Sequence, residues 1–145
     1  MSPSTEMAIA KPAALPANIA NEPYMNQRQL DFFRQRLEAL KEEAHGHIQS
    51  AQAALSQRIE LNDEADLAQH EEESRLALRI IDRESKLLTK IAAALERVRS
   101  GEYGYCQESG EPIGIARLLI RPTAEYCAEI KNQMEEREKH YGKHR

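Results

Sequence analysis

The sequence is short of the residues that build a rounded core or a cross-linked scaffold. Among 145 residues there is no Trp, 5% are aromatic, and two are cysteines, too few for a fold held by disulfides. No apolar run approaches the roughly 20 residues that a membrane-spanning helix needs. Basic residues are outnumbered by acidic ones, 20 against 24, for a net charge of -4. This balance argues against free DNA or RNA as the main partner, because phosphate binding needs a basic surface.

Charged residues as a whole are abundant, at 30% of the chain. That composition suits a long charged helical hairpin better than a globule. Residues 1–23 are rich in Ala and Pro and match neither a secretory signal nor a transit peptide. We therefore expect a disordered N-terminal tail over 1–23 and a cytoplasmic protein.

Two long segments have the apolar spacing of three and four residues that is typical of a coiled coil. The first follows Asn26, a candidate N-cap, and the second ends near Gly101. The first segment carries Leu30, Phe33, Leu37, Leu40 and Ala44 and then, after a stutter, Ile48, Ala51 and Leu55. The second carries one stripe of Leu78, Ile81, Ser85, Leu88, Ala92 and Leu95 and another of Ile80, Leu87, Ile91, Ala94 and Val98. We expect an antiparallel hairpin over 24–100, with one stripe facing the first helix and the other facing a second body.

The turn of this hairpin, at about 60–68, is acidic. Asp63 or Asp66 is a candidate cap for the second helix, and Glu64 lies between them. One interpretation is a solvated helix start, where carboxylates interact favourably with the helix dipole. The other is a set of carboxylates displayed at the end of a rod about 50 Å long.

A small turn-rich module is expected over 101–122, followed by a C-terminal helix and tail over 123–145. Thr123 is the candidate cap of that helix, which we expect from about 124 to 141. The apolar residues expected to pack the module are Ile113, Ile115, Leu118, Ile120, Tyr126 and Ile130.

Two cysteines open half-sites that are laid out like those of a zinc ribbon. Cys106 and Cys127 occupy the first position of each half-site, but the second positions hold Ser109 and Ile130. Structural zinc takes four donors, and an Ile side chain has none, so we expect no zinc and no stably bound cofactor. A weak site that recruits an outside ligand and a redox pair of thiols are the alternatives.

Several short motifs, taken together and in order, resemble those of the DksA/TraR family of bacterial RNA polymerase regulators. The resemblance covers about residues 24–138. The motifs are Asp63-Glu64-Ala65-Asp66-Leu67-Ala68, Glu71-Glu72-Glu73, Asp82-Arg83-Glu84, Gly104-Tyr105-Cys106, Gly114-Ile115 and Arg121-Pro122-Thr123-Ala124. The resemblance implies a mainly α fold: a long antiparallel coiled-coil hairpin, a small zinc-ribbon-like globule and a C-terminal helix.

The resemblance also implies site residues. Family members insert the hairpin into the secondary channel of RNA polymerase. The resemblance therefore implies that Asp63, Asp66 and Ala68 act at the tip, near the polymerase active site, and that Arg83 contacts the polymerase. They act with the alarmone ppGpp, whose binding positions match Leu87, Lys90, Arg121 and Lys131. The missing cysteines are typical of the branch that does without zinc.

The function implied is regulation of transcription by a monomer, with no catalysis and no sequence-specific contact to nucleic acid. Ribosomal-RNA-type promoters would be inhibited together with ppGpp, and some biosynthetic promoters activated. Two alternatives are a Gre-like factor, whose tip acids hold a metal ion for transcript cleavage, and a structural coiled coil that only self-associates.

Overall fold

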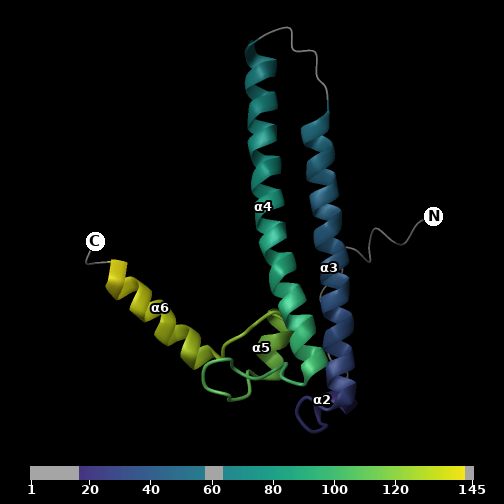
Figure 1. Ribbon diagram of the computed structural model, residues 1–145, viewed down its shortest axis with the longest axis vertical. Coiled ribbons are helices and arrows are strands. Elements are labelled where there is room, and N and C mark those ends of the chain that lie inside the picture. Colours follow the sequence, from purple (N-terminus) through teal and green to yellow (C-terminus); the bar gives the residue numbers. More distant parts are fainter. Residues whose placement is uncertain (1–16, 58–63, 143–145) are drawn as a thin grey trace, which may run out of the picture. The chain divides into compact units, whose positions relative to one another are not determined.

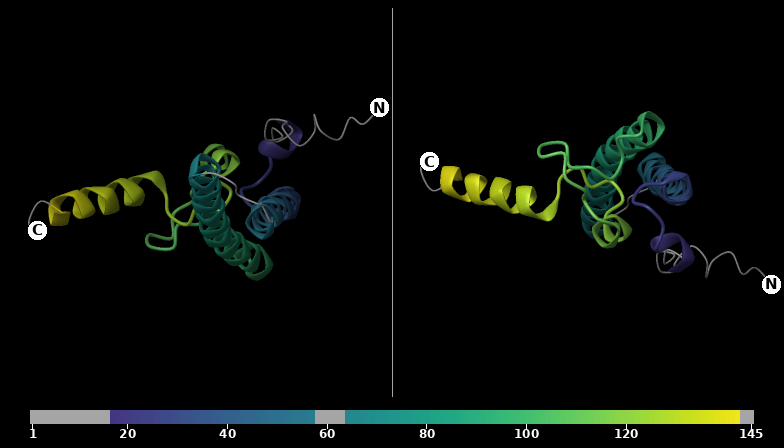
Figure 2. Two further views of the ribbon diagram at one scale, coloured as in Figure 1. Left: turned by 90° about the horizontal axis from the view of Figure 1, so that it is seen from above. Right: turned by 90° about the horizontal axis from the view of Figure 1, so that it is seen from below.

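The computed structural model describes residues 17–57 and 64–142, which fold as two compact units. The hairpin unit is Gln35–Ala93, and the globular unit comprises Met1–Arg34 and Ala94–Arg145. The helices are α2 (Ala17–Ala20), α3 (Gln27–Ser56), α4 (Glu64–Ser100), α5 (Ile115–Ile120) and α6 (Ala128–Gly142). Within the hairpin unit, α3 and α4 run side by side in opposite directions (Figures 1 and 2). The mainly α hairpin predicted from the sequence is confirmed.

Other pairing of the backbone is sparse. Over the described ranges, the β-type pairing is one isolated antiparallel bridge between Tyr105 and Pro112. None of the described helices is long and apolar enough to cross a membrane.

The N-terminal end of α3 is fixed by side-chain hydrogen bonds. Asn26 caps the helix, as predicted, since its Oδ1 accepts a hydrogen bond from the Gln29 amide at 3.0 Å. The fully buried Gln29 donates through Nε2 to the carbonyls of Ile19 (2.8 Å) and Glu22 (3.2 Å). Residues 17–23, expected to belong to a disordered tail, therefore form α2 and a turn held by one buried amide. Residues 1–16 lie outside the described ranges.

The buried face of α4 differs from the expectation. Its buried residues are Ala77, Glu84, Ile91, Ala94 and Arg97, and Ile80, Leu87 and Val98 are half-buried. The stripe assigned to a second body is thus part of one continuous seam spaced by three and four residues. The stripe that begins at Leu78 is more exposed: Leu78, Ser85 and Ala92 are exposed, whereas Ile81, Leu88 and Leu95 are half-buried. A charged residue in the seam, Glu84, concealed it from a prediction based on apolar residues.

The C-terminal end of α4 matches its predicted signal, whereas Asp66 is not the cap at its N-terminal end. The helix begins at Glu64, so Asp66 lies inside the first turn and is not the cap; Asp63 lies outside the described residues. At the other end Gly101 has φ 83°. The Glu102 amide donates to the Arg97 carbonyl at 2.9 Å and the Gly101 amide to Val98 at 3.4 Å. This Schellman pair ends the helix where the sequence predicted.

The segment after Gly101 contains two departures from the prediction. The short helix α5 was not foreseen, and it buries Leu118 while Ile120 is 86% exposed, so Ile120 is not part of the core. The last helix begins at Ala128, not near 124, and Thr123 is not its cap. The backbone carbonyls just before α6 accept hydrogen bonds from outside the helix. The Glu125 carbonyl accepts from the Gln107 amide at 2.8 Å, and the Tyr126 carbonyl accepts from Arg117 Nε at 3.1 Å.

Two tyrosine hydroxyls tie distant segments of the globular unit together. Tyr24 donates to the Gly104 carbonyl at 2.6 Å and accepts from the Gly114 amide at 2.9 Å. Tyr103 is fully buried, packs against the Phe33 ring at a centroid distance of 5.6 Å, and donates to the Pro122 carbonyl at 2.7 Å. Burial raises the pKa of both hydroxyls, so both stay protonated as donors at neutral pH.

We predict that Tyr24→Phe destabilises the globular unit by about 1–3 kcal/mol, because the Gly114 amide loses its hydrogen-bond acceptor. Denaturant unfolding measures the loss, and faster hydrogen exchange at the Gly114 amide localises it. Tyr141→Phe, which removes a hydroxyl from an exposed ring, is the matched control. Equal stability of the two variants would show that the Tyr24 bridge is not needed.

Candidate functional site

The hairpin tip presents acidic side chains at the start of α4. Glu64 and Asp66 lie in its first turn, and Asp66 and Ala68 are both exposed. Carboxylates at this end of a helix are stabilised by the partial positive charge of the unpaired amides. Asp63, the third predicted tip residue, lies outside the described residues.

Arg83 lies within a small charged cluster on the hairpin. Glu84 beside it is buried, and its Oε1 lies 3.5 Å from Arg83 Nη2 and 3.3 Å from His47 Nδ1. The Arg83 side chain itself is 74% exposed. A buried carboxylate needs such partners, because desolvation without them is costly. Arg83 therefore balances the buried Glu84 and leaves further N–H donors at the surface.

The four residues predicted to bind ppGpp divide between the two units. Leu87 (half-buried) and Lys90 (exposed) lie on α4 in the hairpin unit. Arg121 is exposed directly after α5, and Lys131 is half-buried in the first turn of α6, both in the globular unit. A joint site made by the four remains a prediction.

Cys106, Ser109 and Cys127 come together in the globular unit. Ser109 contacts both cysteines: its amide lies 3.5 Å from Cys106 Sγ and its Oγ lies 3.9 Å from Cys127 Sγ. Cys106 is buried and Cys127 half-buried, and both are free thiols. A tight turn closes the Cys106 loop, in which the Gly110 amide donates to the Cys106 carbonyl at 2.9 Å and Gly110 has φ 75°.

The Cys106 sulfur receives several hydrogen bonds. Burial by itself raises the pKa of this thiol. The Ser109 side chain and the amides of Ser109, Cys127 and Glu108 act in the opposite direction and together lower the pKa to about 6. Hydrogen-bond donors around the sulfur thus hold the pKa of the Cys106 thiol below that of an ordinary cysteine.

Comparisons with known proteins agree on one family. The model of the DnaK suppressor protein DksA N-terminal domain matches residues 29–98, and that of the prokaryotic dksA/traR C4-type zinc finger matches residues 101–129. A protein of Caulobacter vibrioides named RNA polymerase-binding transcription factor DksA is 47% identical over 120 residues, covering 82% of this chain and 84% of its own length. The chain belongs to the DksA family.

Two further relatives extend the DksA match. The Escherichia coli protein of the same name is 40% identical over 119 residues, which is 81% of this chain and 79% of that protein. The solved structure of transcription factor DksA2 from Pseudomonas aeruginosa superposes with a TM-score of 0.75 at 46% identity. That match covers 84% of this chain and 97% of the other.

The DksA zinc-finger model raises the question of whether this module can hold zinc. The four positions are Cys106, Ser109, Cys127 and Ile130. Two are thiols, Ser109 offers a neutral hydroxyl, and Ile130 offers no donor, whereas structural zinc takes four donors. Over residues 17–57 and 64–142, no cluster of three or more His, Cys, Asp or Glu side chains could hold a metal ion. The donor set does not fit the four-thiolate zinc site of the family model.

We predict that Ser109→Ala raises the pKa of Cys106 above 6, because it removes the side-chain hydrogen bond to the sulfur. Ser109→Thr keeps a hydroxyl and should keep the low value. The pH dependence of Cys106 alkylation, measured in a Cys127→Ala background, reports the midpoint. The same midpoint with and without the Ser109→Ala substitution would contradict this account of the thiolate.

Proposed function

We propose that this chain regulates transcription by binding RNA polymerase, with the hairpin inserted into the secondary channel and the acidic tip near the active site. Two relatives of the chain support the proposal, because both are named RNA polymerase-binding transcription factor DksA. The observation that carries it is the exposed pair Glu64 and Asp66 in the first turn of a continuous helix. From Glu64 to Ala93 that helix spans about 45 Å at 1.5 Å per residue. Such a rod can bring carboxylates deep into a narrow channel.

The alarmone ppGpp is the proposed co-regulator, bound at the polymerase by Leu87, Lys90, Arg121 and Lys131. Three of these four side chains are cationic, which suits a ligand with several phosphate groups. Together with ppGpp the protein would inhibit ribosomal-RNA-type promoters and activate some biosynthetic promoters. It would act as a cytoplasmic monomer, without catalysis and without sequence-specific contact to nucleic acid.

Zinc has no part in the proposed function. The Cys106 sulfur takes up hydrogen bonds from Ser109, Cys127 and Glu108. Backbone hydrogen bonds also close the loop, from the Cys106 amide to the Glu111 carbonyl and from the Ile113 amide to the Gly104 carbonyl, each at 2.8 Å. The globule can therefore close around its own donors and its buried side chains.

Transcription in vitro from a ribosomal-RNA promoter, with and without ppGpp, tests the proposed function. Inhibition by the protein that deepens with ppGpp is expected. A parallel assay on backtracked complexes should show no transcript cleavage, which separates this function from that of a Gre-like factor. Failure to bind core polymerase would leave only a structural coiled coil.

Asp66→Asn should abolish inhibition while changing polymerase affinity by no more than a few-fold. An exposed charge at a rod end adds little to a large interface but alters the electrostatics around it. Glu71→Gln, which also removes one exposed carboxylate from α4, is the control and should retain inhibition. Loss of binding in proportion to loss of inhibition would contradict a role specific to the tip.

Lys90→Ala and Lys131→Ala should each remove the ppGpp-dependent part of the inhibition and spare the part seen without ppGpp. Each lost charge-assisted contact should weaken ppGpp binding by about 1.5–3 kcal/mol. Lys139→Ala, an exposed lysine on α6 that lies 4.0 Å from Glu136, is the control. Full stimulation by ppGpp in both test variants would reject the assignment.

A further inference from the structure

The globular unit brings two free thiols, Cys106 and Cys127, to one place. Ser109 contacts both of them, with its amide nitrogen 3.5 Å from Cys106 Sγ and its Oγ 3.9 Å from Cys127 Sγ. The Cys127 amide also donates a hydrogen bond to the Cys106 sulfur. Because the two side chains meet around the same residue, both sulfurs can reach one small ion. Thiol sulfurs are soft ligands, so the ion they favour is a soft metal.

The number of donors decides which soft metal fits. Structural zinc takes four ligands and iron–sulfur clusters take four cysteines, so two thiols can hold neither. Cu(I) is a soft ion that thiolates select, and two thiolates in line fill its coordination. The other two ribbon positions keep the number low: Ser109 offers a neutral hydroxyl, and Ile130, which has no donor, lies three residues after Cys127 and thus on the same side of α6.

The surrounding backbone compensates for the charge of such a site. One Cu(I) ion between two thiolates leaves a single net negative charge. The Cys106 sulfur receives hydrogen bonds from the amides of Ser109, Cys127 and Glu108. Cys127 directly precedes α6 and its carbonyl accepts from the Lys131 amide at 3.0 Å, so this residue occupies the N-cap position. The positive end of the helix dipole stabilises a thiolate there.

We infer that Cys106 and Cys127 bind one Cu(I) ion in a two-coordinate dithiolate site. The ion enters from the side of Ser109, which is exposed, past the half-buried Cys127 to the buried Cys106. Two S–Cu bonds form, the remaining thiol protons pass to solvent, and no oxidation state changes. The inference does not depend on the proposed function, because it uses residues of the globular unit alone.

The test measures Cu(I) affinity of the reduced full-length protein by competition with a chromogenic Cu(I) chelator. Oxygen is excluded, because copper and oxygen together would oxidise the thiols, and excess glutathione is present as a competing single thiol. Cys106→Ser and Cys127→Ser each remove one sulfur at nearly constant size. Circular dichroism and thermal unfolding of the metal-free variants establish that each one folds.

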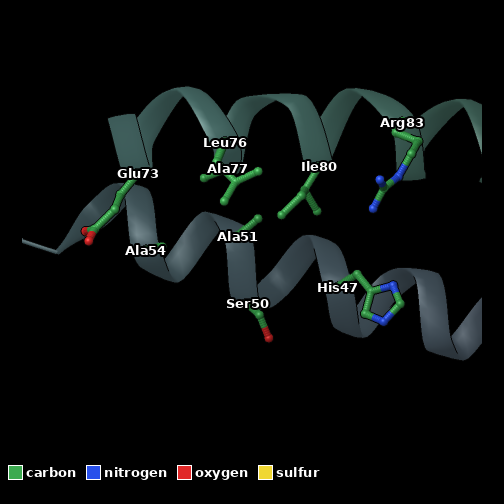
Figure 3. A pocket seen from close by; sticks show the side chains of 9 residues that line it. All are labelled: His47, Ser50, Ala51, Ala54, Glu73, Leu76, Ala77, Ile80 and Arg83. Carbon is green, nitrogen blue, oxygen red and sulfur yellow. The ribbon is translucent and has the colours of Figure 1, made fainter. Parts of the chain in front are cut away.

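His47→Gln is the matched control, because imidazole also binds copper. His47 lies on α3 in the hairpin unit, at the same end of an apolar groove as Arg83 (Figure 3). Removing its imidazole tests for copper held by a surface histidine, without altering either thiol.

We expect one Cu(I) per chain in the wild-type protein and in His47→Gln, and an affinity about 100-fold lower or less in each cysteine variant. Even an outer partner of a metal ligand is worth about 10–100-fold, so losing a ligand costs at least as much. Equal affinity in the wild-type protein and both cysteine variants would overturn the inference.

Two measurements on the wild-type protein do not depend on the variants. X-ray absorption of the copper-loaded protein should show two sulfur neighbours, and nitrogen neighbours or a third sulfur would overturn the two-coordinate site. Sedimentation should show a loaded monomer, and a copper-dependent dimer would assign the ion to thiols of two chains and overturn a site within one. Stoichiometric zinc bound in place of Cu(I) under the same conditions would overturn the choice of metal.

Discussion

The Tyr24 hydroxyl connects three segments that are far apart in the sequence. It joins the residues before α3 to Gly104, at the start of the turn-rich module, and to Gly114, just before α5. Both glycines have positive φ, and at Gly104 a Cβ would lie 2.7 Å from Met25 Cγ. The backbone must therefore approach closely at a place where only glycine fits. Within the globular unit this contact joins three segments of a module that has two of the four thiols of a zinc ribbon.

One backbone carbonyl links the end of the long helix to this arrangement. The Arg97 carbonyl accepts from the Glu102 amide at 2.9 Å and from the Tyr103 amide at 3.1 Å. The first bond ends α4, and the second fixes Tyr103, whose hydroxyl then reaches Pro122. The Arg97 guanidinium also forms an ion pair with Glu125, in which Arg97 Nη1 lies 3.7 Å from Glu125 Oε1. The module is thus attached to the end of the helix by hydrogen bonds and an ion pair, in addition to the packing of the buried Tyr103.

The sequence predicted the elements with regular periodicity and missed those that depend on distant partners. Asn26 marks the start of α3 through a side-chain cap and Gly101 marks the end of α4 through its positive φ, so both could be recognised from the sequence. The most buried face of α4 was not recognised as one continuous stripe, because it includes Glu84, a charged residue that lies close to His47 and Arg83. The start of α6 was placed too early, because Thr123 has the chemistry of a cap while the carbonyls of Glu125 and Tyr126 are used by Gln107 and Arg117. In the candidate site the structure brings Cys106, Ser109 and Cys127 together, and the contacts of Ser109 with the two sulfurs could not be read from the sequence.

We propose that hydrogen bonds and packing, without zinc, hold the globular unit closed. The most direct test of this proposal combines the metal content of protein purified without added zinc with thermal unfolding in the presence and absence of a chelator. We expect less than stoichiometric zinc and the same unfolding midpoint in both conditions, with hydrogen exchange at Gly114 and Ile113 unchanged. A stoichiometric zinc ion whose removal unfolds the globular unit would contradict the account.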